Sequence, residues 1–188
     1  GSDGKGSMTR ILVSDSISQE GLEILKGSGF DVVYKPEITP EDLVKEIADF
    51  DALVIRSRSN VTADVLKAGK KLKVVGRAGV GLDNVDVATA TKLGVIVMNT
   101  PGGNTISTAE QSFAMLMSVA RSIPQANGSM HAGAWDKKKY MGVELYNKTL
   151  GVCGMGRIGT EVAKRALAFG MHVMAYDPVI SSEAAPKL

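Results

Sequence analysis

Several features are scarce in this sequence, and each scarcity excludes a class of protein. The only cysteine, Cys153, rules out an internal disulfide and is typical of a reducing compartment, so we expect a cytoplasmic protein. No run of about 18 apolar residues is present, which argues against a membrane-spanning segment. The 22 Lys and Arg nearly balance the 20 Asp and Glu and are scattered among them, so neither a nucleic-acid surface nor a membrane-binding face is indicated.

The composition that is present is typical of a globular protein with a substantial core. Of the 188 residues, 44% are hydrophobic. The opening GSDGKGS, residues 1–7, is rich in glycine and serine and precedes Met8. We therefore expect residues 1–7 to be an expression remnant that takes no part in the fold.

Short apolar segments alternate with segments of helical length in the first half of the chain. The expected strands are 10–15, 31–35, 52–57, 72–78 and 94–99. The expected helices between them are 16–29, 39–50, 62–71 and 85–94. Because unalternating Val, Ile and Leu strands separated by helices form parallel sheets covered on both faces, this half predicts an α/β domain.

Capping residues predict where two of these helices begin. Thr39 is expected at the N-cap of the second helix, with Pro40 at its first position and Asp42 at its third. In the first helix, Ser16 and Gln19 have the spacing of a capping box.

The pattern changes at the turn cluster NTPGGNT, residues 99–105, which a long helical segment follows. Ser107 and Glu110 have the spacing of a capping box at the start of this segment. Pro124 is expected to kink or split the helix, because proline removes a hydrogen bond of the helix interior.

The segment GVCGMGRIG, residues 151–159, has the spacing G-x-G-x-x-G between an expected strand at 149–156 and a helix at 157–170. A second strand, 172–178, carries Asp177 near its end. In this context the pattern predicts a dinucleotide-binding turn. The alternative is a structural glycine-rich turn that binds no nucleotide.

Each part of the motif has an expected role. Gly154 makes the tight turn, Gly156 lets the backbone approach a pyrophosphate, and Gly159 lets the helix pack against the strand. The helix that begins near Arg157 directs its N–H groups at the phosphates. Asp177 accepts hydrogen bonds from the adenosine ribose, and its charge favours NAD over NADP.

Five segments together resemble the D-isomer-specific 2-hydroxyacid dehydrogenase family, and within it the branch that oxidises 3-phosphoglycerate. They are VIRSRSNVT (54–62), VVGRAGVGLDNVD (74–86), VMNTPGGNTISTAE (97–110), KTLGVCGMGRIGTEVAKRA (148–166) and YDP (176–178).

The resemblance implies how the chain is organised. Residues 8–98 would form the N-terminal segment of a flavodoxin-like substrate-binding domain. Residues 99–188 would contain linking helices and the first half of a Rossmann NAD-binding domain, with the active site in the cleft between the domains. The long helix after NTP would belong to the interface of a homodimer or higher homo-oligomer.

The resemblance also implies which residues bind ligands, and it implies no metal site. The implied substrate-binding residues, which would hold the small anionic substrate 3-phosphoglycerate, are Arg56, Ser57, Arg77, Ala78 and Gly79. The implied NAD-binding residues are Val80, Thr108, Gly154, Gly156, Arg157, Ile158, Gly159, Tyr176 and Asp177. The ends of parallel strands and the bidentate arginine fork independently favour Arg56 and Arg77. Arg58 fits a surface arginine as well as a substrate contact.

The catalytic Arg, Glu and His of family members follow the YDP strand and would lie beyond Leu188. His131 and His172 do not stand in the matching context, so we expect no catalytic residue in this chain and no turnover by it alone. The chain would be the N-terminal part of an enzyme that forms 3-phosphohydroxypyruvate in L-serine biosynthesis. The alternatives are another D-2-hydroxyacid dehydrogenase, of the glyoxylate or D-lactate type, and a non-catalytic NAD-sensing protein of the corepressor type.

Overall fold

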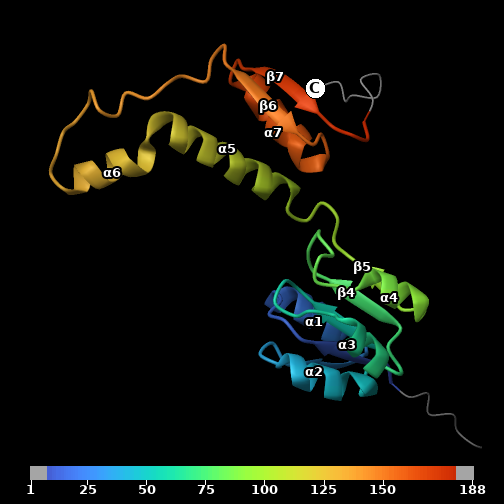
Figure 1. Ribbon diagram of the computed structural model, residues 1–188. Helices are drawn as coiled ribbons and strands as arrows, with labels where there is room; N and C mark the ends of the chain where they lie inside the picture. Colours follow the sequence, from blue (N-terminus) through green and yellow to red (C-terminus); the bar gives the residue numbers. More distant parts are fainter. Residues whose placement is uncertain (1–7, 181–188) are drawn as a thin grey trace, which may run out of the picture. The chain divides into compact units, whose positions relative to one another are not determined.

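The computed structural model describes residues 8–180. The chain divides between Gly103 and Asn104 into two compact units, coloured blue to green and yellow-green to red in Figure 1. The predicted expression remnant, residues 1–7, lies outside the described residues.

The first unit is a parallel sheet whose strands are joined by helices (Figure 1). In chain order its elements are β1 (Arg10–Val13), α1 (Gln19–Gly27), β2 (Asp31–Tyr34), α2 (Pro40–Glu46), the 3-10 helix η1 (Ile47–Asp49), β3 (Ala52–Ile55), α3 (Ala63–Ala68), β4 (Val74–Arg77), α4 (Val87–Lys92) and β5 (Ile96–Met98). The strand order β2-β1-β3-β4-β5 is that of the flavodoxin-like fold. The predicted α/β class and the parallel sheet are confirmed.

Both faces of this sheet are buried, which explains why its strands carry continuous apolar runs. Leu12 and Leu53 pack on one face, in a cluster with residues of α2, α3 and α4. Ile11 and Val13 point to the opposite face and pack with Leu22 of α1. Alternate residues of β1 therefore enter two separate cores.

The helix caps of the first unit confirm one prediction and correct another. Thr39 caps α2 as predicted, because its hydroxyl accepts a hydrogen bond from the Asp42 N–H. The predicted capping box of Ser16 and Gln19 is wrong. Ser18 is the N-cap of α1 and its hydroxyl accepts from the Gly21 N–H, whereas the Ser16 carbonyl belongs to the preceding loop.

The second unit contains a long helix, a shorter one and a strand-helix-strand segment. In chain order its described elements are α5 (Thr105–Arg121), α6 (Ile123–His131), β6 (Thr149–Cys153), α7 (Arg157–Ala168) and β7 (His172–Tyr176). Strands β6 and β7 pair in parallel, with Thr149 opposite His172. The predicted split of the long helix is confirmed, since Ser122 adopts a left-handed conformation and Pro124 lies in the first turn of α6.

The start of α5 differs from the prediction. The helix begins at Thr105 with Asn104 at the N-cap and no side-chain cap, so the predicted capping box of Ser107 and Glu110 is wrong. Ser107 lies inside the first turn, and its hydroxyl donates to the Asn104 carbonyl. The Glu110 carboxylate instead faces α7, at 3.6 Å from the Arg165 guanidinium.

A small core joins α5 to α7 and to the strands of this unit. Phe113, Leu145, Ala166 and Met171 are buried together, and the Phe113 ring lies 4.8 Å from that of Phe169. The two-stranded sheet itself is largely uncovered. No helix among residues 8–180 has the length and hydropathy needed to cross a membrane.

Candidate functional site

The segment between β6 and α7 forms the turn that the glycine spacing predicts. Gly154 follows β6 directly and has a φ of 98°, a conformation that side chains other than glycine rarely adopt. A Cβ on Gly159 would lie 3.1 Å from the Gly154 carbonyl carbon and closer to its oxygen, so helix and turn touch there. A Cβ on Gly156 would meet no atom within 4 Å, so the space beside this residue is open.

The N-terminus of α7 faces this open space without a capping side chain. The helix begins at Arg157, and its N-cap is Gly156, which has no side chain to accept from the first-turn N–H groups. Such N–H groups, together with the helix dipole, favour an anion. Ile158 and Gly159 complete this first turn. The arrangement fits a phosphate group held by the backbone.

Asp177 follows β7 and ties its strand end to the glycine turn. Its carboxylate accepts hydrogen bonds from the N–H groups of Met155 at 2.8 Å, Val179 at 2.9 Å and Ile180 at 3.1 Å. The Val179 and Met155 amides hold the pKa of Asp177 below its ordinary value, so the group is ionised at neutral pH. The neighbouring Tyr176 side chain is exposed.

The predicted substrate-binding residues of the first unit lie at one edge of the sheet. Ile55 and Arg77 are register partners in β3 and β4, and the Ala78 N–H donates to the Ile55 carbonyl at 2.8 Å. The carboxyl ends of β3 and β4 are therefore adjacent. Arg56 and Ser57 follow β3, and Ala78 and Gly79 follow β4, so the two pairs leave the sheet at neighbouring strand ends. Arg56 and Ser57 are exposed.

The two arginines at this edge are held differently. The Arg56 guanidinium donates to the Ser16 carbonyl at 3.2 Å and remains exposed. The Arg77 side chain is 11% exposed, and its guanidinium contacts the Gly81 carbonyl and lies 3.0 Å from the Asp83 carboxylate. The Arg77 Nε is buried without a hydrogen-bond partner among the described residues.

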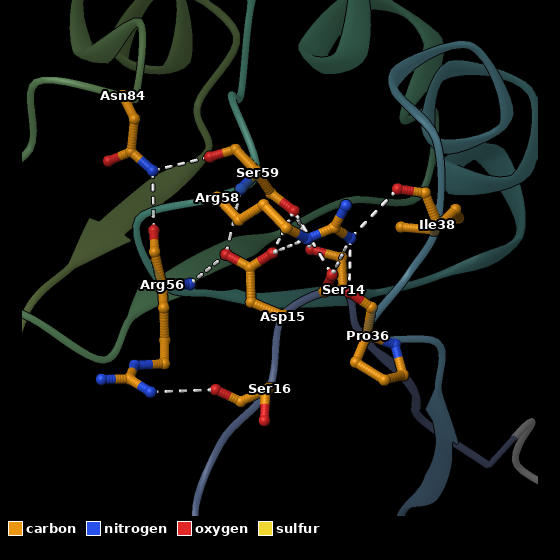
Figure 2. A network of polar contacts seen from close by, with 9 residues as sticks. All are labelled: Ser14, Asp15, Ser16, Pro36, Ile38, Arg56, Arg58, Ser59 and Asn84. Carbon is orange, nitrogen blue, oxygen red and sulfur yellow. Dashed lines mark hydrogen bonds and ion pairs between the residues drawn. The ribbon is translucent and has the colours of Figure 1, made fainter.

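Arg58 has contacts to the backbone of neighbouring loops. Figure 2 shows its guanidinium among the ends of three loops, where it donates to the carbonyls of Ser14, Pro36 and Ile38. It also lies 3.6 Å from the Asp15 carboxylate. The side chain therefore links the ends of β1 and β2 to the turn after β3.

Two residues of this region were missed by the sequence analysis. Asp15 is 2% exposed, and its carboxylate accepts from the backbone of Arg56 and Ser59 (Figure 2). Asn84 is also buried and donates to the same two residues. For Asp15 the sequence held a signal, since this carboxylate lies two residues after the apolar run 11–13, where a strand ends.

The remaining predicted ligand-binding residues, Val80 and Thr108, lie one in each unit, and Val80 directly follows Gly79. The Val80 carbonyl accepts from the Asn99 amide in the first unit. Thr108 lies in the first turns of α5, where its carbonyl accepts from the Ser112 hydroxyl. His131 ends α6 and His172 begins β7. Residues 8–180 contain no group of His, Cys, Asp or Glu that would hold a metal ion.

The fold and the site together define an α/β protein with a flavodoxin-like sheet and a Rossmann-like βαβ segment. A family model for the D-isomer specific 2-hydroxyacid dehydrogenase catalytic domain matches residues 11–184. The chain belongs to this family, which confirms the resemblance.

Named relatives agree with this assignment. The chain is 53% identical over 179 residues to the D-3-phosphoglycerate dehydrogenase of Rattus norvegicus, covering 95% of this chain and 34% of that protein. The enzyme of the same name from Bacillus subtilis is 52% identical over 182 residues, covering 96% and 34%. The NAD+-bound 3-phosphoglycerate dehydrogenase of Entamoeba histolytica superposes with a TM-score of 0.75 at 31% identity, covering 97% and 58%. The chain thus spans about a third of the length of these curated relatives.

Proposed function

We propose that this chain is part of an NAD-dependent dehydrogenase that oxidises 3-phosphoglycerate to 3-phosphohydroxypyruvate in L-serine biosynthesis. In this proposal residues 8–98 supply the substrate-binding domain and residues 99–188 supply the first half of the NAD-binding domain. The observation that carries it is the order β6, glycine turn, α7 and β7, with the Asp177 carboxylate accepting from the turn. The names of the related proteins support the choice of substrate.

The residues of the second unit fit an NAD molecule. The open space beside Gly156 and the uncapped start of α7 would take the pyrophosphate, and Asp177 would take the adenosine ribose. Bound NAD would supply the hydride acceptor for the reaction. Arg157, Ile158 and Tyr176 would contribute as neighbours of these groups, and Thr108 as a contact to the nicotinamide half. Val80 belongs to the first unit, and only the family resemblance implies a contact between it and the nicotinamide half.

The residues of the first unit fit a small anion that carries two acidic groups. Arg56 is exposed at the end of β3, and its planar guanidinium can form two parallel hydrogen bonds to a carboxylate or a phosphate. Arg77 at the end of β4, with the backbone of Ser57, Ala78 and Gly79, would complete the anion-binding edge. Because positive and negative charges nearly balance over the whole chain, anion binding here would depend on these two arginines and not on the net charge of the protein.

We also propose a cytoplasmic protein that forms a homodimer or a higher homo-oligomer. The single cysteine supports a reducing compartment. Exposed apolar side chains on α5, among them Met115 and Val119, support an interface between copies.

Calorimetry on the 188-residue chain tests the cofactor assignment. We expect NAD to bind and NADP to bind more weakly, because the Asp177 charge repels the 2′-phosphate. Asp177→Ala is expected to weaken NAD binding and to relax the discrimination. Asp136→Ala, which removes another carboxylate of the second unit, is the control. Equal affinity of the unmodified chain for NAD and NADP would contradict the proposal.

Nuclear magnetic resonance titration tests the substrate assignment. We expect 3-phosphoglycerate to shift the signals of residues 56–57 and 77–79, and Arg56→Ala to abolish these shifts. D-lactate and glyoxylate, which lack the phosphate, should bind more weakly. Stronger binding of either would favour the alternative D-2-hydroxyacid dehydrogenases, and NAD binding without any acid would favour the NAD-sensing alternative.

A further inference from the structure

Two buried side chains, those of Asp15 and Asn84, form hydrogen bonds with the backbone at both ends of the turn from Arg56 to Ser59. The Asp15 carboxylate accepts from the Arg56 N–H at 2.6 Å and from the Ser59 N–H at 3.1 Å. The Asn84 amide donates to the Arg56 carbonyl at 2.7 Å and to the Ser59 carbonyl at 2.6 Å. One side chain thus takes both donors and the other takes both acceptors, as Figure 2 shows.

These contacts have the features of a rigid support. Asp15 is 2% exposed, and its second oxygen accepts from the Ser59 hydroxyl at 2.6 Å. Hydrogen bonds to an ionised group are stronger than those between neutral groups. The backbone of Asn84 is anchored, because its main-chain carbonyl accepts from the Val61 N–H at 2.8 Å, whereas the side-chain Oδ1 is buried without a hydrogen-bond partner among the described residues. Rotation of the turn would leave buried polar groups unpaired, which is costly.

The same contacts connect three strand ends. Asp15 follows β1, the turn follows β3, and Asn84 lies in the loop that follows β4. That loop also contains Gly81 and Asp83, the two groups that hold the Arg77 guanidinium. Asn84 therefore joins the turn that carries Arg56 to the loop that restrains Arg77.

We infer that Asp15 and Asn84 are positioning residues that set the Arg56 side chain in register with the loop around Arg77, so that both arginines can hold one anion. This inference rests on the proposed function only for the nature of that anion. Asp15 and Asn84 need not touch the ligand, since they act through the backbone of the turn. A small displacement of such a support lowers affinity because the anion-binding groups no longer converge.

The first experiment measures amide hydrogen exchange in the 188-residue chain and does not depend on any ligand. In Asp15→Ala we expect the Ser59 amide to exchange about 10-fold faster or more, the factor that loss of a hydrogen bond to a charged group implies. The β3 amides should stay protected. Asp15→Asn should restore slow exchange, because its amide oxygen can accept from both N–H groups and its NH₂ can donate to the Ser59 hydroxyl.

The control is Asp51→Ala. Asp51 directly precedes β3, at the end of this strand opposite to the 56–59 turn. Asp51 accepts from the Arg10 N–H at 3.0 Å and pairs with Lys73 at 3.3 Å. It should destabilise the unit without changing exchange at Ser59. Asn84→Ala is the second test variant if Asp15→Ala fails to fold. Unchanged Ser59 exchange in the folded test variant overturns the inference.

The second experiment measures 3-phosphoglycerate affinity in the same variants. We expect Asp15→Ala and Asn84→Ala to bind about 10-fold more weakly, which corresponds to about 1.4 kcal/mol. Asp15→Asn and Asp51→Ala should bind like the unmodified chain. Faster exchange with unchanged affinity overturns the positioning role. If the unmodified chain binds no 3-phosphoglycerate, the proposed substrate fails, and the exchange result alone decides the inference.

Discussion

Alanine substitution of the three motif glycines, Gly154, Gly156 and Gly159, should have a different effect at each position, because each glycine is required for a different reason. Gly154 has a φ of 98°, so Gly154→Ala should cost about 1–3 kcal/mol of backbone strain. In Gly159→Ala the new Cβ would press on the backbone of Gly154, 3.1 Å from its carbonyl carbon, and should cost about 1–3 kcal/mol. Both changes are expected to destabilise the second unit.

Gly156→Ala should behave in the opposite way. Its φ of −67° and ψ of −166° suit alanine, and a Cβ there meets no atom within 4 Å. The cost in stability should stay below about 1 kcal/mol, the difference between glycine and alanine at an N-cap. The Cβ would however occupy the space expected for the pyrophosphate. NAD affinity should fall about 10-fold or more, or about 1.4 kcal/mol.

Two measurements are needed. Hydrogen exchange of the α7 amides in increasing urea gives the stability of the second unit, and calorimetric titration gives the NAD affinity. Gly151→Ala is the control, because this glycine of β6 also has open space beside it but lies before the turn. It should change neither stability nor NAD affinity appreciably. If Gly156→Ala binds NAD like the unmodified chain, or Gly159→Ala is as stable as Gly151→Ala, the roles assigned to these glycines are wrong.

Three further predictions concern stability. Burial acts to raise the pKa of Asp15, but hydrogen bonds from Ser59 and Arg56 outweigh it and lower the pKa. Ionised Asp15 therefore stabilises the fold above its ordinary pKa of 3.8, and this stabilisation is lost as the pH falls through the lower pKa of the folded state. The unfolding free energies of Asp15→Asn and of the unmodified chain should consequently converge in acid. Arg58→Lys should lower the unfolding free energy by about 1–2 kcal/mol, because the guanidinium contacts the three carbonyls through Nη2 and the Asp15 carboxylate through Nε, and a single ammonium cannot take both positions; an unchanged urea midpoint would refute this. Amides in 150–157 and 172–176 should exchange faster than those in 53–56 in a monomeric sample, since β6 and β7 form an isolated pair; equal protection would contradict it.

The strands and their parallel arrangement were predictable because the information is local. Each strand of the first unit is a short apolar run bounded by turn residues, and burial on both faces demands such runs. The glycine turn was predictable for the same reason, since Gly154 and Gly159 meet within one continuous segment. Spacing alone was enough to place the start of α7 at Arg157.

The caps and the support of the turn after β3 were not predictable from spacing. Ser16 and Ser18 are chemically identical candidates, and only the path of the loop makes Ser18 the cap of α1. Asp15 is separated from Arg56 by 41 residues and Asn84 from Arg56 by 28. Contacts at such separations arise from the strand order, which brings the ends of β1, β3 and β4 to one edge.

The contacts of Asp177 refine the argument for a preference between NAD and NADP. An ionised carboxylate offers about four acceptor positions, and three backbone N–H groups already occupy the Asp177 carboxylate. These amides leave acceptor capacity for a ribose hydroxyl, which brings a donor, but they do not remove the negative charge. Because the same amides lower the pKa, protonation cannot relieve the repulsion of a 2′-phosphate near neutral pH. The discrimination against NADP should therefore persist down to acid pH, and its loss between pH 6 and 8, a range far above the ordinary carboxylate pKa of about 3.9, would have to come from another group.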